Sequence, residues 1–197
     1  MTQAGQVRGS DGLVRCGWAV GQEYEQYHDT EWGVAVRGER ALLERITLEA
    51  FQSGLSWMTI LRKRDAFRAA FDQFDPDVVA AYDEQQVRRL LDDAQIVRNE
   101  RKIRAAIVNA RATLALRAHG GLEELFWSAR PASHPAPLTL DQVPATTTES
   151  TVLAAALKAA GFRHVGPTTM YAAMQACGVV DDHVLGCHRC VPEISSE

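Results

Sequence analysis

The clearest sign of a helical fold is the stretch VRRLLDDAQIVRNERKIRAAIVNAR, residues 87–111. Its apolar residues recur every three or four positions on both sides of a short break, which is the spacing of two amphipathic helices. Within the break, Ile96 and Val97 are placed to pack between the two helices. The stretch therefore predicts a helical hairpin with a tight turn.

The start of the second helix in this hairpin is polar and basic, with Arg98, Asn99, Arg101 and Lys102 close together. A helix N-terminus offers unpaired N–H groups and the positive end of the helix dipole to a phosphate. Over residues 86–117 basic side chains outnumber acidic ones eight to three, although the whole chain carries a net charge of −4. The pattern fits a helix-hairpin-helix element at about 84–118 that grips a DNA backbone, and it equally fits a plain helical hairpin with a solvated basic face.

The helical period continues through most of the chain. Ser56, Asp75 and Asp83 are expected N-caps, because each offers a side-chain oxygen just before a helical segment. A stretch rich in Pro, Ser and Thr at 130–150 predicts a surface connection. Since no alternating strand of useful length is found, we predict an all-α fold. The expected helices cover residues 39–54, 57–71, 74–82, 83–94, 100–121, 151–161 and 167–178.

Length and composition bound the class of protein. The 197 residues are 46% hydrophobic and 23% charged, as in an ordinary soluble globular protein. No apolar run is long enough to span a membrane, and no apolar segment near the N-terminus resembles a secretion signal. We therefore expect a cytoplasmic protein without membrane association. One folded unit is expected over 15–190, with a flexible extension at 1–14 and a flexible tail at 191–197.

Residue types that bind metals stand near both ends of the chain. Cys16 and His28 lie near the N-terminus, and His183 and Cys187 lie four positions apart near the C-terminus. Two Cys and two His suit tetrahedral zinc, and such a site would tie both ends to the body of the protein. The alternative is that Cys16 is a small buried hydrophobe and His28 a surface residue. Two further residues are near enough to compete as ligands: His188 and Cys190.

Seven motifs, in order, cover nearly the whole chain and resemble one known family. They are RCGW at 15–18, YEQYHDTEWG at 24–33, LEAFQSGLSWMTIL at 48–61, FDPDVVA at 74–80, IVRNERKI at 96–103, GFRHVGPTTMYAAMQACG at 161–178 and DDHVLGCHRC at 181–190. Together they resemble the 3-methyladenine DNA glycosylase I family, which belongs to the helix-hairpin-helix superfamily of base-excision glycosylases. The resemblance implies a fold of that type, in which a zinc site joins the N- and C-terminal segments.

The resemblance also implies an activity and a metal site. The expected enzyme is a monomer that hydrolyses the N-glycosidic bond of N3-methyladenine in double-stranded alkylated DNA, without cutting the backbone. The implied ligands of a structural zinc ion are Cys16, His28, His183 and Cys187, with His188 and Cys190 left as bystanders.

The implied base pocket combines one carboxylate with aromatic faces, which suits a cationic purine extruded from the duplex. The positions that match the family's motifs make Glu49 the catalytic, base-reading carboxylate and Trp57 the stacking face. Tyr24 and Tyr27 flank the base, with Trp18 as a further wall. The expected DNA contacts are Gly54, Leu55 as the wedge that fills the gap, Arg98, Asn99, Arg101 and Lys102.

Some features common in glycosylases are missing from the sequence. The hairpin at 94–102 has no Gly, no Lys falls in the implied pocket, and the loop after the long helix offers only Asp141, in an unlike setting. These differences favour a monofunctional enzyme without lyase activity. Two other functions remain possible at this point. One is a non-catalytic reader of damaged DNA, and the other is a zinc-stabilised helical protein with no role on nucleic acids.

Overall fold

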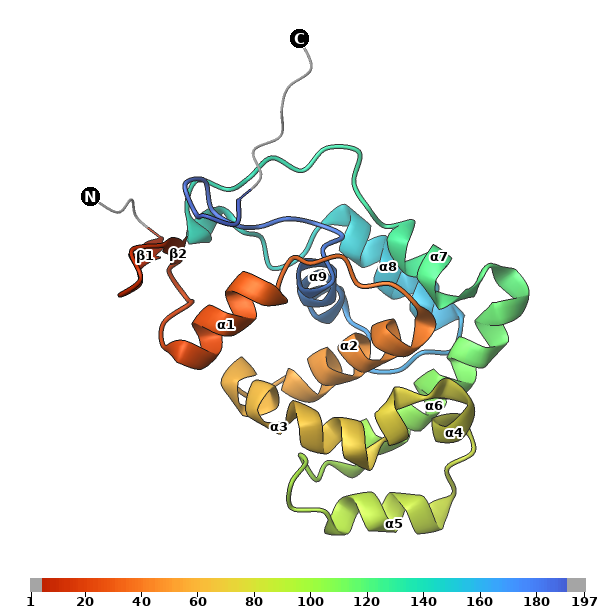
Figure 1. Cartoon of the computed structure of the whole chain (residues 1–197). Helices are drawn as coiled ribbons and strands as arrows, with labels where there is room; N and C mark the ends of the chain where they lie inside the picture. Colours follow the sequence, from red (N-terminus) through yellow and green to blue (C-terminus); the bar gives the residue numbers. More distant parts are fainter. Residues whose placement is uncertain (1–4, 191–197) are drawn as a thin grey trace.

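The computed structural model describes residues 5–190, and the expected tail at 191–197 lies outside the described residues. Helices dominate this range, as predicted (Figure 1). A small antiparallel sheet of two three-residue strands, β1 (Gln6–Arg8) and β2 (Val14–Cys16), is the exception. The α-helices are α1 (Gln22–Thr30), α2 (Glu39–Gln52), α3 (Trp57–Ala70), α4 (Pro76–Ala80), α5 (Glu84–Asp92), α6 (Glu100–Leu116), α7 (Gly121–Trp127), α8 (Thr148–Ala159) and α9 (Pro167–Ala176).

Side-chain caps begin several helices at the predicted residues. Ser56 accepts a hydrogen bond from the Thr59 N–H at 3.3 Å, and the Asp75 and Asp83 carboxylates do the same for α4 and α5. These three N-caps are confirmed. The start of α8 differs from the prediction, because Thr147 is its N-cap and Ser150 completes a capping box three residues later.

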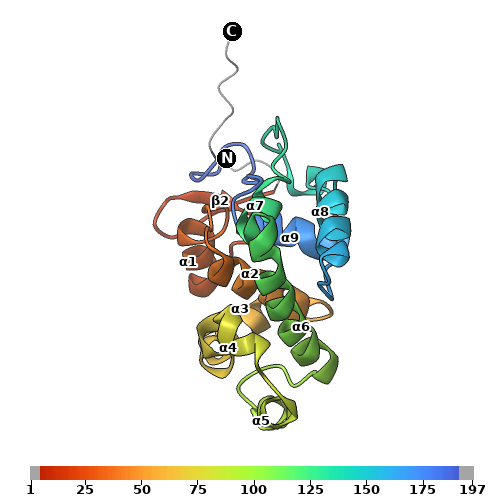
Figure 2. The same cartoon turned by 90° about the vertical axis from the view of Figure 1, so that its right-hand side faces the viewer.

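Helix α2 forms the centre of the molecule, between α3 and α6 on one side and α9 on the other (Figures 1 and 2). Eight of its fourteen residues are buried. Phe51 at its end meets the ring of Phe67 at a centroid distance of 4.8 Å, in an edge-on arrangement typical of aromatic cores. Ile96 is buried in the same core, as the hairpin pattern predicts. Glu49 is itself one of the buried residues of α2, so it is carried on a firmly packed helix.

Contacts from α6 and from the segment after α1 fix the positions of α8 and α9. The buried Asn109 of α6 donates to the Arg163 carbonyl and accepts from the Arg163 N–H, which holds the turn between α8 and α9. Beyond α9, Gly178 has φ +70°, and a Cβ there would lie 2.6 Å from the Gly33 carbonyl oxygen. Only glycine fits this contact between the end of α9 and the segment after α1.

The two ends of the chain lie side by side (Figure 1). The Gln6 side chain donates to the Leu185 carbonyl at 2.7 Å, and the His188 N–H donates to the Val14 carbonyl at 2.8 Å. The expectation of a flexible extension at 1–14 is therefore wrong from Gly5 onward, where the chain forms the β1–β2 hairpin. Among the described residues, no helix is both long and apolar enough to cross a membrane.

Candidate active site

A cavity of about 510 Å³ lies between the N-terminal segment, α2, α3 and α9. Aromatic rings form much of its wall, and two carboxylates and two amides supply most of the polar surface. Its volume is in the range of small-molecule sites. The lining residues are Trp18, Tyr24, Tyr27, Trp32, Glu49, Gln52, Trp57, Leu140, Val143, Ala172, Gln175 and Asp182. All five residues implied for the base pocket are among them.

Glu49 is the most unusual group in the cavity. Its side chain is 5% exposed and has no hydrogen-bond partner among the described residues. Burial raises the pKa of this carboxyl group to about 8, while Arg45 one turn earlier on α2 lowers it to a smaller extent. A carboxyl group that an apolar pocket keeps protonated and uncharged at neutral pH is typical of a functional site.

The aromatic walls are held in contact with one another. Tyr27 and Trp57 have ring centroids 5.4 Å apart, and Trp18 meets Tyr24 edge-on at 5.9 Å. The Tyr24 hydroxyl accepts a hydrogen bond from the Met58 N–H at 3.1 Å. This bond ties α1 to the first turn of α3, so the two sides of the pocket are positioned together.

Trp32 also belongs to this wall. Its ring lies 5.1 Å from that of Trp18 and 4.6 Å from that of His183, and it lines the cavity. Sequence reasoning also missed the other polar and apolar lining residues. Gln52 and Asp182 stand inside motifs already singled out, which is a signal that could have found them. Leu140 and Val143 come from a segment with no pattern.

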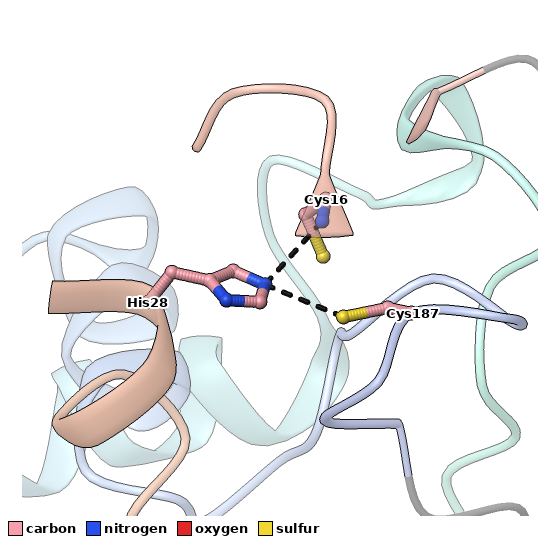
Figure 3. A group of neighbouring side chains, drawn as sticks. All are labelled: Cys16, His28 and Cys187. Carbon is pink, nitrogen blue, oxygen red and sulfur yellow. Dashed lines mark hydrogen bonds between the residues drawn. The ribbon is translucent and has the colours of Figure 1, made fainter. Parts of the chain in front are cut away.

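A cluster of Cys and His side chains lies beside the cavity. The ligand atoms of Cys16, His28 and Cys187 all lie within 4.8 Å of one another. Figure 3 shows the His28 ring pointing at the other two residues, with Nε2 3.4 Å from the Cys187 sulfur. The pKa of Cys187 is lowered, because the Cys16 thiol and His28 stabilise the Cys187 thiolate. The pKa of Cys16 is raised, because its thiol keeps the proton with which it bonds the Cys187 sulfur. A thiolate is the form that binds metals.

His183 approaches this cluster from the C-terminal side. Its ring centroid is 4.9 Å from that of His28, and its Nδ1 bonds the Asp181 carboxylate at 2.6 Å. Its Nε2 is buried without a hydrogen-bond partner, which is costly unless something else occupies that position. In the same way, Asp29 bonds Nδ1 of His28 at 2.8 Å. The ligand atoms of Cys16, His28 and Cys187 form one compact group, and His183 lies beside it. Each imidazole is oriented by a carboxylate, and two thiols with two imidazoles are a ligand set that suits zinc.

The residues expected to contact DNA divide into two groups. Gly54 and Leu55 form the turn between α2 and α3, where Leu55 is 39% exposed. Lys102 does not present its ammonium group freely, because Nζ donates to the Phe51 and Ser53 carbonyls at 3.0 and 2.7 Å. Lys102 therefore holds the α2–α3 turn in place, and Asn99 caps α6.

Basic side chains of α6 and of the α8–α9 turn line a second groove. Arg98 and Arg101 are exposed, and no described residue pairs with either. Arg101 lines a groove of about 420 Å³ together with Arg163 and His164 of the α8–α9 turn. The groove also includes Arg104, which pairs with Glu84 and Glu100. Arg163 and His164 were not predicted, although they stand in the motif GFRHVGP.

Comparison with known proteins decides what kind of site this is. A family model described as methyladenine glycosylase matches residues 18–190. The chain is 47% identical to DNA-3-methyladenine glycosylase 1 of Escherichia coli (strain K12) over 182 residues, which is 89% of this chain and 96% of that protein. It is 40% identical to DNA-3-methyladenine glycosylase of Haemophilus influenzae, over 88% of this chain and 96% of that protein.

The chain belongs to the methyladenine glycosylase family. It is thus an enzyme, a hydrolase that acts on N-glycosyl bonds. A crystal structure of 3-methyladenine DNA glycosylase I superposes on this glycosylase with a TM-score of 0.86 at 45% identity, covering 90% of this chain and all of that chain. The Staphylococcus aureus enzyme, whose structure addresses 3-methyladenine recognition, gives 0.81 at 30% identity, covering 85% of this chain and 91% of that chain.

The buried Glu49 makes the stability of the glycosylase depend on pH. Between its ordinary value of 4.5 and about 8, this group is neutral when folded and ionised when unfolded. In this window the folded protein binds one more proton than the unfolded chain. The free energy of unfolding therefore falls by up to about 1.4 kcal/mol for each unit by which the pH rises. We expect Glu49→Gln to gain stability relative to wild type as pH rises from 5 to 8, in urea unfolding followed at each pH. Glu124→Gln, on the exposed face of α7, is the control and should follow the wild-type curve; a constant difference between Glu49→Gln and wild type would contradict the prediction.

Proposed function

We propose that this glycosylase releases N3-methyladenine from double-stranded alkylated DNA by base flipping and acts as a monofunctional enzyme. The observation that carries the proposal is a cavity walled by aromatic rings, in which the carboxyl group of Glu49 is buried without a hydrogen-bond partner among the described residues. The names of the relatives agree with it, since those proteins are 3-methyladenine glycosylases. A solved structure of a single-residue variant of 3-methyladenine DNA glycosylase I contains 3-methyladenine itself.

The cavity suits a cationic purine. Methylation at N3 places a positive charge on the ring, and aromatic faces attract such a charge by about 0.5–2 kcal/mol. In the empty cavity Glu49 is mostly protonated and uncharged at neutral pH, because no cation compensates for its burial. A cationic ring beside it lowers its pKa and favours the carboxylate, which then accepts a hydrogen bond from the exocyclic amine. A neutral purine gives no such compensation, so the cavity selects for charge.

The same charge explains how the bond is broken. A cationic purine is already a good leaving group, so hydrolysis needs no strong general acid. Glu49 and the rings of Trp57 and Tyr27 hold the base while water adds to the sugar carbon and loses a proton to solvent. The C–N bond electrons leave with the ring, which departs as neutral 3-methyladenine. No lysine is among the residues that line the cavity. We therefore expect no covalent step with the sugar and no strand cleavage.

The base reaches the cavity only after leaving the stack. Leu55 at the exposed α2–α3 turn is the proposed wedge, and Gly54 beside it provides the positive φ of the turn. Arg98 and Arg101 of the α5–α6 hairpin are the proposed phosphate contacts. Arg163 and His164 extend this interface to the α8–α9 turn, which borders the same groove as Arg101.

The proposed role of zinc is structural. Cys16, His28, His183 and Cys187 would hold the ion, which would supply a cross-link between the two ends of the chain. This cross-link would make residues 15–190 one unit, which we expect to act as a monomer. The aromatic wall would depend on it, because Trp18 and Trp32 contact the His28 ring.

Release of the free base tests the proposed activity. Wild-type protein incubated with methylated duplex DNA should release 3-methyladenine, measured by chromatography, and leave the strands uncut until alkali is added. Glu49→Gln should lower the rate by at least about 100-fold, because the variant cannot become a carboxylate. Glu124→Gln should keep the wild-type rate. Tight binding to methylated DNA without any released base would instead support a non-catalytic reader.

Replacing one cysteine at a time tests the metal site. Cys187→Ser should remove bound zinc, measured by elemental analysis, and lower the melting temperature, since a ligand and its thiolate are lost. Cys190→Ser, three residues away, is the matched control and should keep one zinc ion per chain. Equal zinc content in both variants would contradict the assignment of the ligands.

A further inference from the structure

The long connection between α7 and α8, residues 128–147, closes one side of the cavity. It holds a single turn of 3₁₀-helix, Leu140–Gln142, and its Leu140 and Val143 side chains line the cavity. The other walls come from regular helices or from the joined chain ends. This α7–α8 connection is therefore the irregular part of the site, and its position must be fixed by specific contacts.

One such contact reaches the cavity wall directly. His134 of the α7–α8 connection bonds Asp182 through Nε2 at 2.8 Å. Asp182 is 4% exposed, and its other oxygen accepts hydrogen bonds from the Tyr171 hydroxyl and the Gln175 amide, both at 2.7 Å. Asp182 and Gln175 line the cavity themselves. The carboxylate thus joins the connection to α9 at the edge of the site.

The rest of the connection is fixed on both sides of Leu140. The Leu185 N–H donates to the Pro137 carbonyl at 2.8 Å, which attaches the connection to the C-terminal segment. Leu140 packs against the cluster of Cys16, Val184 and Cys187, and Val143 packs against the main core. Leu138, two residues before Leu140, is 52% exposed and does not line the cavity.

We propose that His134 is a positioning residue for base recognition, whose bond to Asp182 holds the α7–α8 connection so that Leu140 and Val143 form an apolar wall against the base. The inference rests on the proposed function of the cavity. This wall lies beside polar lining groups that include the carboxyl groups of Glu49 and Asp182 and the two amides. By excluding water, it strengthens the polar contacts that these groups make with the methylated base.

Each part of this wall makes a separate contribution to affinity. Removing two methyl groups from a wall residue lowers affinity for the base by about tenfold, in line with other apolar pockets. Loss of the His134 bond removes the link between the connection and Asp182, and we expect an effect of the same size. Glutamine at position 134 restores the bond, because its amide N–H reaches a distance similar to that of imidazole Nε2.

Binding of free 3-methyladenine, followed by quenching of tryptophan fluorescence, tests the inference. Val143→Ala and His134→Ala should each weaken binding about tenfold, with unchanged zinc content and a raised KM on methylated DNA. His134→Gln should restore most of the affinity. Val152→Ala makes the same change as Val143→Ala at a site on α8 that is 62% exposed and outside the cavity, and it should bind as wild type does.

The possible failures are distinguishable. If wild-type protein binds and releases 3-methyladenine while Val143→Ala and His134→Ala bind it as tightly, the inference is wrong and the proposed function stands. If His134→Ala lowers the melting temperature without weakening binding, His134 is only a structural residue, which also overturns the inference. If wild-type protein neither binds nor releases the base, the proposed function itself fails.

Discussion

The contact between His28 and Cys187, 159 positions apart in the chain, is the constraint on which the site depends. It lies where the segment after β2 meets the segment after α9, and neither segment has a long helix of its own to hold it. Trp18 and Trp32 contact the rings of this cluster and at the same time line the cavity. The cluster and the aromatic wall are thus one packed unit, so whatever joins the chain ends also places the rings.

Opposite this unit stands a carboxyl group that the fold buries at a cost. Glu49 is carried on α2, a firmly packed helix, and burial raises its pKa to about 8. The free energy that the empty protein loses by burying Glu49 is recovered when a cation enters beside it. Under the proposed function this cation is the alkylated purine, and the cavity selects for its charge. Enzymes commonly place groups that destabilise the free protein at the site where the substrate binds.

Local patterns predicted the helices well, because caps such as Ser56 and Asp83 act within a few residues. Helices α1 and α7 were not predicted, because they begin after Gly21 and Gly120 and neither has a side-chain cap. Three of the four predicted metal ligands come together as a compact group, and the five predicted pocket residues line one cavity. Lys102 was assigned to phosphate, yet it caps α2, since only the fold brings the start of α6 beside that helix end. Asp182 acts through partners on α9 and in the α7–α8 connection, which no local pattern reveals.

The dependence of the base pocket on the joined chain ends is open to direct measurement. Calorimetric titration with 3-methyladenine should be made on zinc-loaded protein and again after removal of the metal by a chelator, with circular dichroism recording the helix content. We predict that the stripped protein keeps most of its helices, binds the base at least about tenfold more weakly, and regains affinity when zinc is returned. Unchanged affinity in protein shown to have lost its metal would contradict the claim that the chain ends hold the aromatic wall.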